Sequence, residues 1–449
     1  MPIAFVTYET PFAPCGGIAA VMRYLPGWRK RLMRDNSCGR GVTVEDLVAA
    51  RLSPDAGRER SACFVPRARF RRADASPAVA AVAGFSSKMC PRWPMWNGER
   101  PMLTHECSYC AQIPKAEIHV HLEGSVRPET LQKLDPDLTM SGIASLYAGA
   151  GLPPSGAVLS AIGQRLHSAA DYARVTKELL SSLKQQNVIY VELSLPGTLI
   201  LEQGLDLEAV CDAVHHEIAR SRTDALVLIE AYRDAGPEQL LRLAKATASL
   251  RRYAVAGLLV GSRGQPAAVD KCQGAIEIAK TNGVKAVLEL ATDDSAEAVW
   301  AAIEAGADRI FGGLGAADDP VLLDYLKAEE VGLVVSPHAA RLGQSQRRTD
   351  SVRRLLQARV PVVFANPYPA FSGATLSASY QEAQDQLLLD DAGVADAAVN
   401  AFYQAFKRPN AVEMMAIESS IRSARAPDAA VSPETPLRLR QRPAFYGFR

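Results

Sequence analysis

The chain has 449 residues, of which 48% are hydrophobic and 22% are charged, and its formal net charge is +1. This composition is typical of a globular protein with enough apolar side chains for a core. It excludes a fibrous repeat, a chain disordered throughout and a small disulfide scaffold. At about 150 residues per domain the length suggests roughly three domains, although one α/β barrel can take 250 residues or more.

The near-neutral charge is a sum of two opposite parts. The first 110 residues hold 16 basic and 9 acidic side chains, a net charge of +7, and the rest holds 34 basic and 40 acidic ones, a net charge of −6. Six of the eight cysteines also lie in the first 110 residues. Two different kinds of sequence are therefore joined in this chain.

The sequence has no apolar run near the roughly 18 residues that a membrane span needs, and no basic segment followed by an apolar one at its start. We therefore expect no membrane partner and a cytoplasmic location. In that compartment the cysteines are expected to be reduced thiols rather than a disulfide framework.

Residues 1–28 read as a short strand, a glycine loop at Gly16 and Gly17, and the start of a helix, which is a geometry that can bind phosphate. Residues 5–26 resemble the opening of two-domain glycosyltransferases of the starch and glycogen synthase kind. That family commonly has a lysine where Pro14 stands, and fewer than about 100 residues separate this motif from the next one. Sugar transfer is therefore not expected, and a sugar-nucleotide binder built on this loop is only a remote alternative.

Residues 29–111 are rich in Arg, Pro and Cys, and we expect a disordered basic linker there. The basic run at residues 67–72 could contact nucleic acid through phosphates, but a solvated linker is favoured and nucleic acid is not an expected partner. A fusion or reading-frame artefact is a third alternative. His105, Cys107 and Cys110 form a cluster, and a Cys-x-x-Cys pair supplies half of a structural zinc site, but no second pair follows at finger spacing, so zinc is not expected there.

Beyond residue 112 short apolar runs alternate with helical patterns, which predicts a TIM (β/α)₈ barrel over residues 112–424 and a mobile tail over residues 425–449. The long gap after the first strand is expected to hold several helices, with residues 160–186 the clearest. The eight expected strands are 116–121, 188–195, 225–232, 255–260, 285–290, 309–312, 332–336 and 361–365.

His119 and His121 lie two positions apart at the end of the first expected strand, so both side chains point to the same side. Two imidazoles at the mouth of a barrel are half of a metal site. A pair of hydrogen-bonded core histidines is the alternative for such a motif on its own.

Residues 113–131 read Ile-Pro-Lys-Ala-Glu-Ile-His-Val-His-Leu-Glu-Gly-Ser-Val-Arg-Pro-Glu-Thr-Leu. This stretch closely resembles the first-strand motif of the adenosine deaminase family, within the metal-dependent amidohydrolases. The resemblance implies one zinc ion, a purine nucleoside or related ligand, and hydrolytic deamination of adenosine to inosine. It also implies that His119 and His121 are zinc ligands and that Glu123 contacts the ribose.

Other positions of that family are replaced here. Its fifth-strand His-Ala-Gly-Glu corresponds to residues 289–292, so Glu289 takes the place of the third ligand and Thr292 that of the catalytic glutamate. Gly312 stands where the sixth-strand histidine would be. At the eighth strand Pro367 takes the place of the ligating aspartate, and Tyr368 that of the aspartate after it.

These replacements predict that deamination is weak or lost, since a lost general acid or base usually costs about two to four powers of ten in rate. The alternative is a rewired zinc hydrolase in which His119, His121 and Glu289 hold the ion in a His₂Glu set. Acids or bases for such an enzyme could then come from Asp293, Asp294 or His338, which follow the fifth and seventh strands.

Overall fold

The computed structural model describes residues 109–148, 154–262 and 269–424. The fragment predicted for residues 1–28, the tail at 425–449 and nearly all of the linker predicted for residues 29–111 lie outside the described residues. The last residues of that linker differ from the prediction. Helix α4 (Tyr109–Gln112) begins there, and its Tyr109 and Cys110 side chains are buried.

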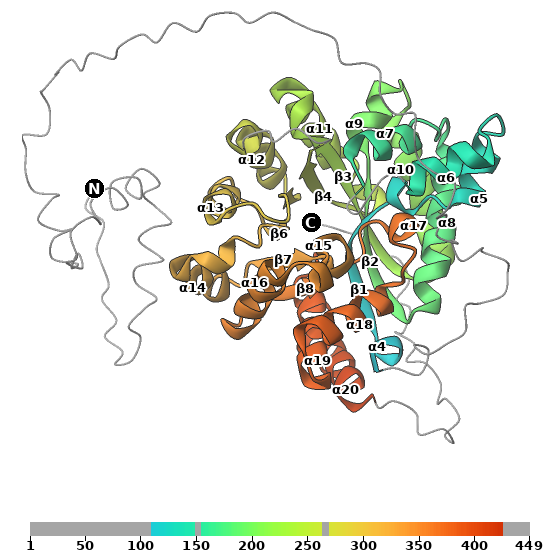
Figure 1. The fold of residues 1–449 in the computed structure, drawn as a ribbon. Coiled ribbons are helices and arrows are strands. Elements are labelled where there is room, and N and C mark those ends of the chain that lie inside the picture. Colours follow the sequence, from blue (N-terminus) through green and yellow to red (C-terminus); the bar gives the residue numbers. More distant parts are fainter. Residues whose placement is uncertain (1–108, 149–153, 263–268, 425–449) are drawn as a thin grey trace, which may run out of the picture. The chain divides into compact units, whose positions relative to one another are not determined.

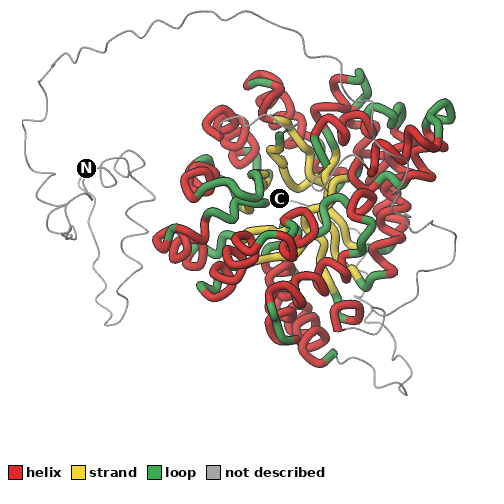
Figure 2. The backbone as a smooth tube through the Cα atoms, in the orientation of Figure 1, coloured by secondary structure: helices red, strands yellow, loops and turns green. Residues whose placement is uncertain are grey.

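Eight parallel strands curl into a TIM barrel with helices outside it, which confirms the predicted fold class (Figures 1 and 2). Each strand pairs with the next in chain order. Strands such as β4, β7 and β8 are runs rich in Val and Leu, the pattern of strands that are buried on both faces. Their bounds are β1 (Lys115–His121), β2 (Val188–Leu195), β3 (Asp224–Tyr232), β4 (Val255–Gly261), β5 (Lys285–Glu289), β6 (Arg309–Phe311), β7 (Gly332–Val335) and β8 (Val362–Phe364).

The segment after β8 is joined to β1 by two hydrogen bonds, and a third bond within β1 orients the carboxylate that makes one of them. The backbone N–H of His121 donates to the carbonyl of Pro367 at 3.0 Å. The buried carboxylate of Glu117 accepts the backbone N–H groups of His119 at 3.0 Å and Asn366 at 2.8 Å. These contacts bring the carboxyl ends of the first and last strands together at the mouth of the barrel.

Helices connect the strands, and several begin at a capping side chain. Asn410, for example, caps α20 in a capping box with Glu413. Besides α4, the helices are α5 (Pro128–Leu134), α6 (Met140–Ala148), α7 (Gly156–Gly163), α8 (Ala169–Gln185), α9 (Gly197–Glu202), α10 (Leu207–Ser221), α11 (Pro237–Ser249), α12 (Gln273–Thr281), α13 (Ala296–Glu304), α14 (Pro320–Ala328), α15 (Pro337–Ala340), α16 (Gln346–Gln357), α17 (Pro369–Ser372), α18 (Leu376–Leu387), α19 (Asp391–Tyr403) and α20 (Ala411–Ser423). Among the described residues no helix is both long and apolar enough to span a membrane.

The helix predicted over residues 160–186 is two helices, α7 and α8, with a break between them. Ser168 caps the second one by accepting the N–H of Asp171. Gly163, at the end of the first, packs so closely on Leu199 that an added Cβ would lie 2.4 Å from a methyl carbon of that side chain. The gap between β1 and β2 therefore holds several helices, as predicted, but the break in this stretch was missed.

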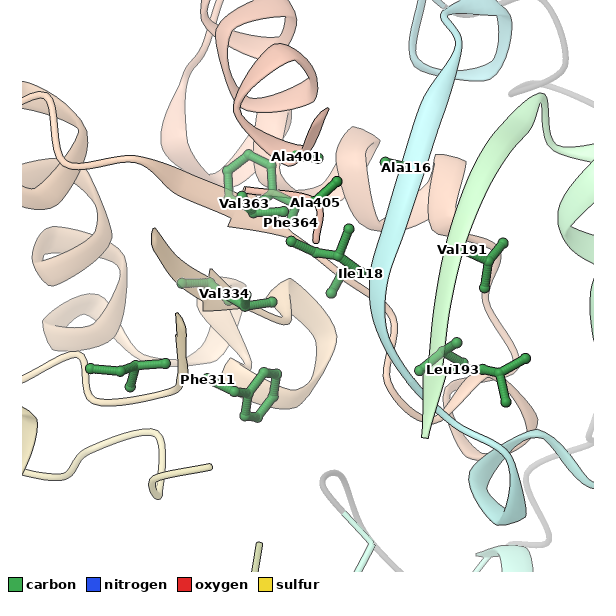
Figure 3. Packing of buried hydrophobic residues seen from close by; sticks show 14 of the residues in the cluster. Ala116, Ile118, Val191, Leu193, Phe311, Val334, Val363, Phe364, Ala401 and Ala405 are labelled. Carbon is green, nitrogen blue, oxygen red and sulfur yellow. The ribbon is translucent and has the colours of Figure 1, made fainter. Parts of the chain in front are cut away.

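The core lies between the strands and the helices, where side chains such as Val191, Val363 and Ala401 pack (Figure 3). A smaller cluster of Leu228, Leu259 and Val287 packs with Phe406. These three residues belong to neighbouring strands, and the side chains two positions later in each strand lie on the same face. In β3 and β5 those later positions are Glu230 and Glu289.

Candidate metal centre

Two histidines and a glutamate from opposite sides of the barrel meet at its mouth. His119 and His121 end β1, and Glu289 ends β5. The Oε1 atom of Glu289 lies 3.5 Å from Nε2 of His119 and 3.3 Å from Nε2 of His121. Both imidazoles are buried, whereas the Glu289 side chain keeps 13% of its surface exposed. The structure thus brings together the three residues that the sequence predicted as metal ligands.

The two distances from Oε1 of Glu289 to the imidazole nitrogens fit a tetrahedral ion. With metal-to-ligand bonds of about 2.0–2.1 Å, the ligand atoms of a tetrahedral zinc site lie about 3.3–3.4 Å apart. None of the four ring nitrogens of His119 and His121 has a hydrogen-bond partner among the described residues. Buried imidazoles normally use at least one ring nitrogen in a hydrogen bond, whereas here three of the ring nitrogens face carboxylate oxygens at 3.3–3.6 Å, which fits a metal centre better than a hydrogen-bonded core pair.

An aromatic ring stacks on each imidazole. Phe311, the last residue of β6, lies parallel to His119 with 4.3 Å between the ring centroids. Tyr368 stacks on His121 with 5.0 Å between centroids, and its hydroxyl donates to Oε1 of Glu289 at 3.2 Å. The two rings fix the orientation of the imidazoles and exclude water from their faces.

Two further carboxylates face the other ring nitrogen of His121. Its Nδ1 atom lies 3.4 Å from Oε2 of Glu230 and 3.6 Å from Oε1 of Glu123. Both acids are buried, and within the part of the chain that the structure describes Oε2 of Glu230 and both oxygens of Glu123 have no hydrogen-bond partner. Three carboxylates therefore surround the two imidazoles, a negative site that favours a cation.

The ionisation of the site follows from burial and from these charges. Burial lowers the pKa of His119 to about 4 and raises that of Glu230 to about 7. Burial opposes charge on His121 as well, but neighbouring acids including Glu230 and Glu289 hold its pKa well above the usual value. The pKa of Glu289 is lowered despite burial because both histidines favour its charged form.

Two glycines leave room for this cluster. A Cβ on Gly261, the last residue of β4, would lie 2.7 Å from Oε1 of Glu230 and 2.7 Å from Oε2 of Glu289. A Cβ on Gly124 would lie 2.9 Å from Cδ1 of Tyr368. The absence of a side chain at both positions lets the acids and the tyrosine approach the histidines.

A family model described as adenosine deaminase matches residues 114–421, more than two thirds of the chain. The chain belongs to the adenosine deaminase family. The match begins well after residues 5–26, so the glycosyltransferase resemblance in that segment stays a prediction.

Relatives of the chain include an adenine deaminase from Cupriavidus necator, 26% identical over 322 residues that make up 68% of this chain and 91% of the relative. An amidohydrolase from Burkholderia ambifaria, solved with bound zinc, has a TM-score of 0.65 at 17% identity and covers 73% of this chain and 98% of its own. An Arabidopsis protein solved with IMP has a TM-score of 0.60 at 17% identity, covering 70% and 98%. The two solved structures support the fold.

The positions that the adenosine deaminase family uses for proton transfer carry other residues. Thr292 is half-buried in the loop after β5, and it lines a small pocket with Phe311 and Gly312. Gly312 follows β6 with φ of +81°, and a Cβ there would lie 2.3 Å from the carbonyl oxygen of Leu290. Pro367 offers only its carbonyl, to His121. Glu123, expected at the ribose, is fully buried beside His121.

The three substitute acids and bases considered from sequence contact other partners. Asp293 accepts hydrogen bonds from the guanidinium of Arg348, and Asp294 accepts the backbone N–H of Ala291. His338 pairs with Glu382. None of the three belongs to the groups of potential metal ligands found among the described residues.

Sequence reasoning missed Glu230, Phe311 and the hydroxyl of Tyr368. A signal for Glu230 existed, because it is a charged residue within the apolar run of β3 and lies two positions after Leu228. Phe311 directly precedes Gly312 at the end of β6, and alternation from the family's histidine position would point its side chain away from the site. The sequence therefore carried a signal for Glu230 but none for Phe311.

Proposed function

We propose that this member of the adenosine deaminase family binds a purine compound at the mouth of its barrel and that its deaminase activity is weak or lost. The weak or lost activity is inferred from the conformation of Gly312. Its φ of +81° and the nearness of the Leu290 carbonyl leave no space for a side chain where the family has its water-orienting histidine.

The ligand class is taken from proteins similar to this chain. One relative is an adenine deaminase, and structural relatives have been solved with IMP and GMP. Base, nucleoside and nucleotide share the purine ring, and this ring is the part of the ligand that the site would recognise. Glu123 as the ribose contact belongs to the same proposal, although its burial means that it would have to act from behind His121.

His119, His121 and Glu289 would hold one zinc ion, because Oε1 of Glu289 lies 3.5 and 3.3 Å from the two Nε2 atoms, close to the ligand-to-ligand distance of a tetrahedral site. When bound, zinc lowers the pKa of a water molecule and so supplies a nucleophile. The remaining steps of deamination need groups that orient this water and protonate the ring. Thr292 and Gly312 offer no titratable group for either task, and each missing acid or base costs about two to four powers of ten in rate.

The test is to incubate the full chain, with zinc supplied, with adenine, adenosine and AMP, and to follow the ultraviolet change of deamination. Calorimetry with inosine and IMP measures binding in parallel. We expect binding of at least one purine and turnover far below the median enzymatic value of about 10 per second. Turnover near that value would overturn the loss of activity, and no binding of any purine would overturn the ligand class.

A rewired zinc hydrolase is the second candidate, and the His₂Glu spacing favours it. It requires about one zinc per chain that is lost in His121→Ala. The matched control is His216→Ala, because His216 is an exposed histidine on α10, outside the barrel mouth. A stably folded wild-type chain that takes up no zinc would exclude this candidate.

A further inference from the structure

The eighth strand no longer supplies the aspartate that would complete the metal site. Pro367 stands at that position, and its ring offers no donor atom. The next residue along the same loop is Tyr368, which lies at the start of α17 (Pro369–Ser372) and is only 6% exposed. Its phenol oxygen is thus an oxygen donor one residue from the lost carboxylate.

The hydroxyl of Tyr368 points at the atom on which the other ligands converge. It lies 3.2 Å from Oε1 of Glu289, and that oxygen lies 3.3 and 3.5 Å from the two Nε2 atoms. All three distances are close to the 3.3–3.4 Å expected between the ligand atoms of a tetrahedral zinc ion. Oε1 of Glu289 thus lies within ligand-to-ligand distance of both imidazoles and of the phenol.

The ring of Tyr368 is held in this position from two sides. It stacks on His121 with an angle of 20° between the planes. On another side it lies against Gly124, where an added Cβ would come within 2.9 Å of Cδ1. The backbone of Pro367, directly before it, is fixed by the hydrogen bond from His121. The hydroxyl therefore has little freedom to turn away from Glu289.

We propose that Tyr368 is the fourth protein ligand of the metal ion, in a His₂-Glu-Tyr set made with His119, His121 and Glu289. This rests on the three-ligand site of the proposed function. Four protein ligands fill a tetrahedral site, and structural zinc sites are closed in this way, whereas catalytic ones keep a position open for water. A closed site gives a second reason, besides Thr292 and Gly312, for weak deamination.

The test replaces colourless zinc with copper(II), because a phenolate bound to this ion gives a visible charge-transfer absorption. Metal content is measured on the same samples of the full chain. We expect the absorption in the wild type and its loss in Tyr368→Phe, which keeps the stacked ring. Tyr147→Phe is the control, since Tyr147 is a buried tyrosine whose hydroxyl donates to the Val126 carbonyl instead.

Zinc affinity provides the second measurement. Removing the hydroxyl should weaken zinc binding by at least about tenfold in Tyr368→Phe and leave it unchanged in Tyr147→Phe. Bound copper without the absorption, or an absorption that persists in Tyr368→Phe, would overturn Tyr368 as a ligand and leave the three-ligand site intact. A chain that binds neither ion would overturn both the ligand and the metal site of the proposed function.

Discussion

Gly312 faces the carbonyl oxygen of Leu290 so closely that a Cβ built on it would lie 2.3 Å from that oxygen. The φ of Gly312, +81°, is one that residues with a side chain rarely adopt. Two separate costs therefore oppose a side chain at the position where the adenosine deaminase family carries its sixth-strand histidine. The backbone around Gly312 therefore differs from one that could hold the histidine, so more than a single side chain separates this site from that of the family.

Gly312→Ala should lower the free energy of unfolding by about 2–5 kcal/mol, as the sum of about 1–2 kcal/mol of backbone strain and about 1–3 kcal/mol of overpacking. Gly204→Ala is the matched control, because Gly204 has φ of +72° with no atom within 4 Å of the added Cβ. Gly204→Ala should lower the free energy of unfolding only by the backbone strain of about 1–2 kcal/mol. Urea unfolding measures both, and equal losses would contradict the steric conflict with Leu290.

Gly312→His, which restores the family residue, should not restore deamination. The imidazole can enter only if the loops after β5 and β6 move, and those loops carry Leu290 and Thr292. The expected result is a destabilised protein whose adenosine turnover stays at the wild-type level. An increase of more than about a hundredfold, the contribution of one general acid or base, would contradict it.

Gly261→Ala should weaken zinc binding without unfolding the barrel. The added methyl would lie 2.7 Å from an oxygen of Glu230 and of Glu289, so both carboxylates must shift. Disturbing a metal ligand or the residues that contact it typically lowers metal affinity by about 10–100-fold. Gly274→Ala is the control, because its Cβ would meet Leu241 at an ordinary 3.6 Å. Zinc affinity that is equal in the two variants would speak against a site containing Glu289.

The eight strands were predictable from the sequence because most of them are short apolar runs that alternate with helical patterns. Every predicted strand is present, with ends that differ by at most one residue, as for Asp224 at the start of β3. His119 and His121 were predictable because both belong to one short sequence motif. Local patterns are what a sequence displays most directly.

The contacts across the barrel were not predictable in the same way. Glu230 meets His121 because β3 and β1 close around the same interior, and Tyr368 meets Glu289 because the loop after β8 lies across the mouth from β5. These pairs are separated by 109 and 79 residues in the chain. Their approach depends on how the strands curl around the barrel interior, which no short pattern encodes.

The buried pair of Arg309 and Glu192 should be essential for stability. The guanidinium of Arg309 donates to Glu192 and to the carbonyls of Ile118 and Gln404, and both side chains are fully buried. Glu192→Gln leaves the guanidinium charge without a counterion, which should cost about 3–5 kcal/mol of unfolding free energy. Breaking the exposed pair of Lys407 and Asp224 by Lys407→Met should cost at most about 1 kcal/mol. Similar losses in both variants would contradict this assignment.

Lys115 should make the stability of the barrel rise between pH 7 and pH 9. Its buried ammonium donates to the carbonyls of Cys110, Ala111 and Ile113, and burial lowers its pKa to about 7. In the unfolded chain the pKa is about 10.4, so between these values the unfolded state binds the extra proton and folding gains stability as pH rises. The wild type should therefore gain about 2 kcal/mol relative to Lys115→Met from pH 7 to pH 9. The exposed Lys327→Met should follow the wild type across this range, and a Lys115→Met profile parallel to the wild type would refute the lowered pKa.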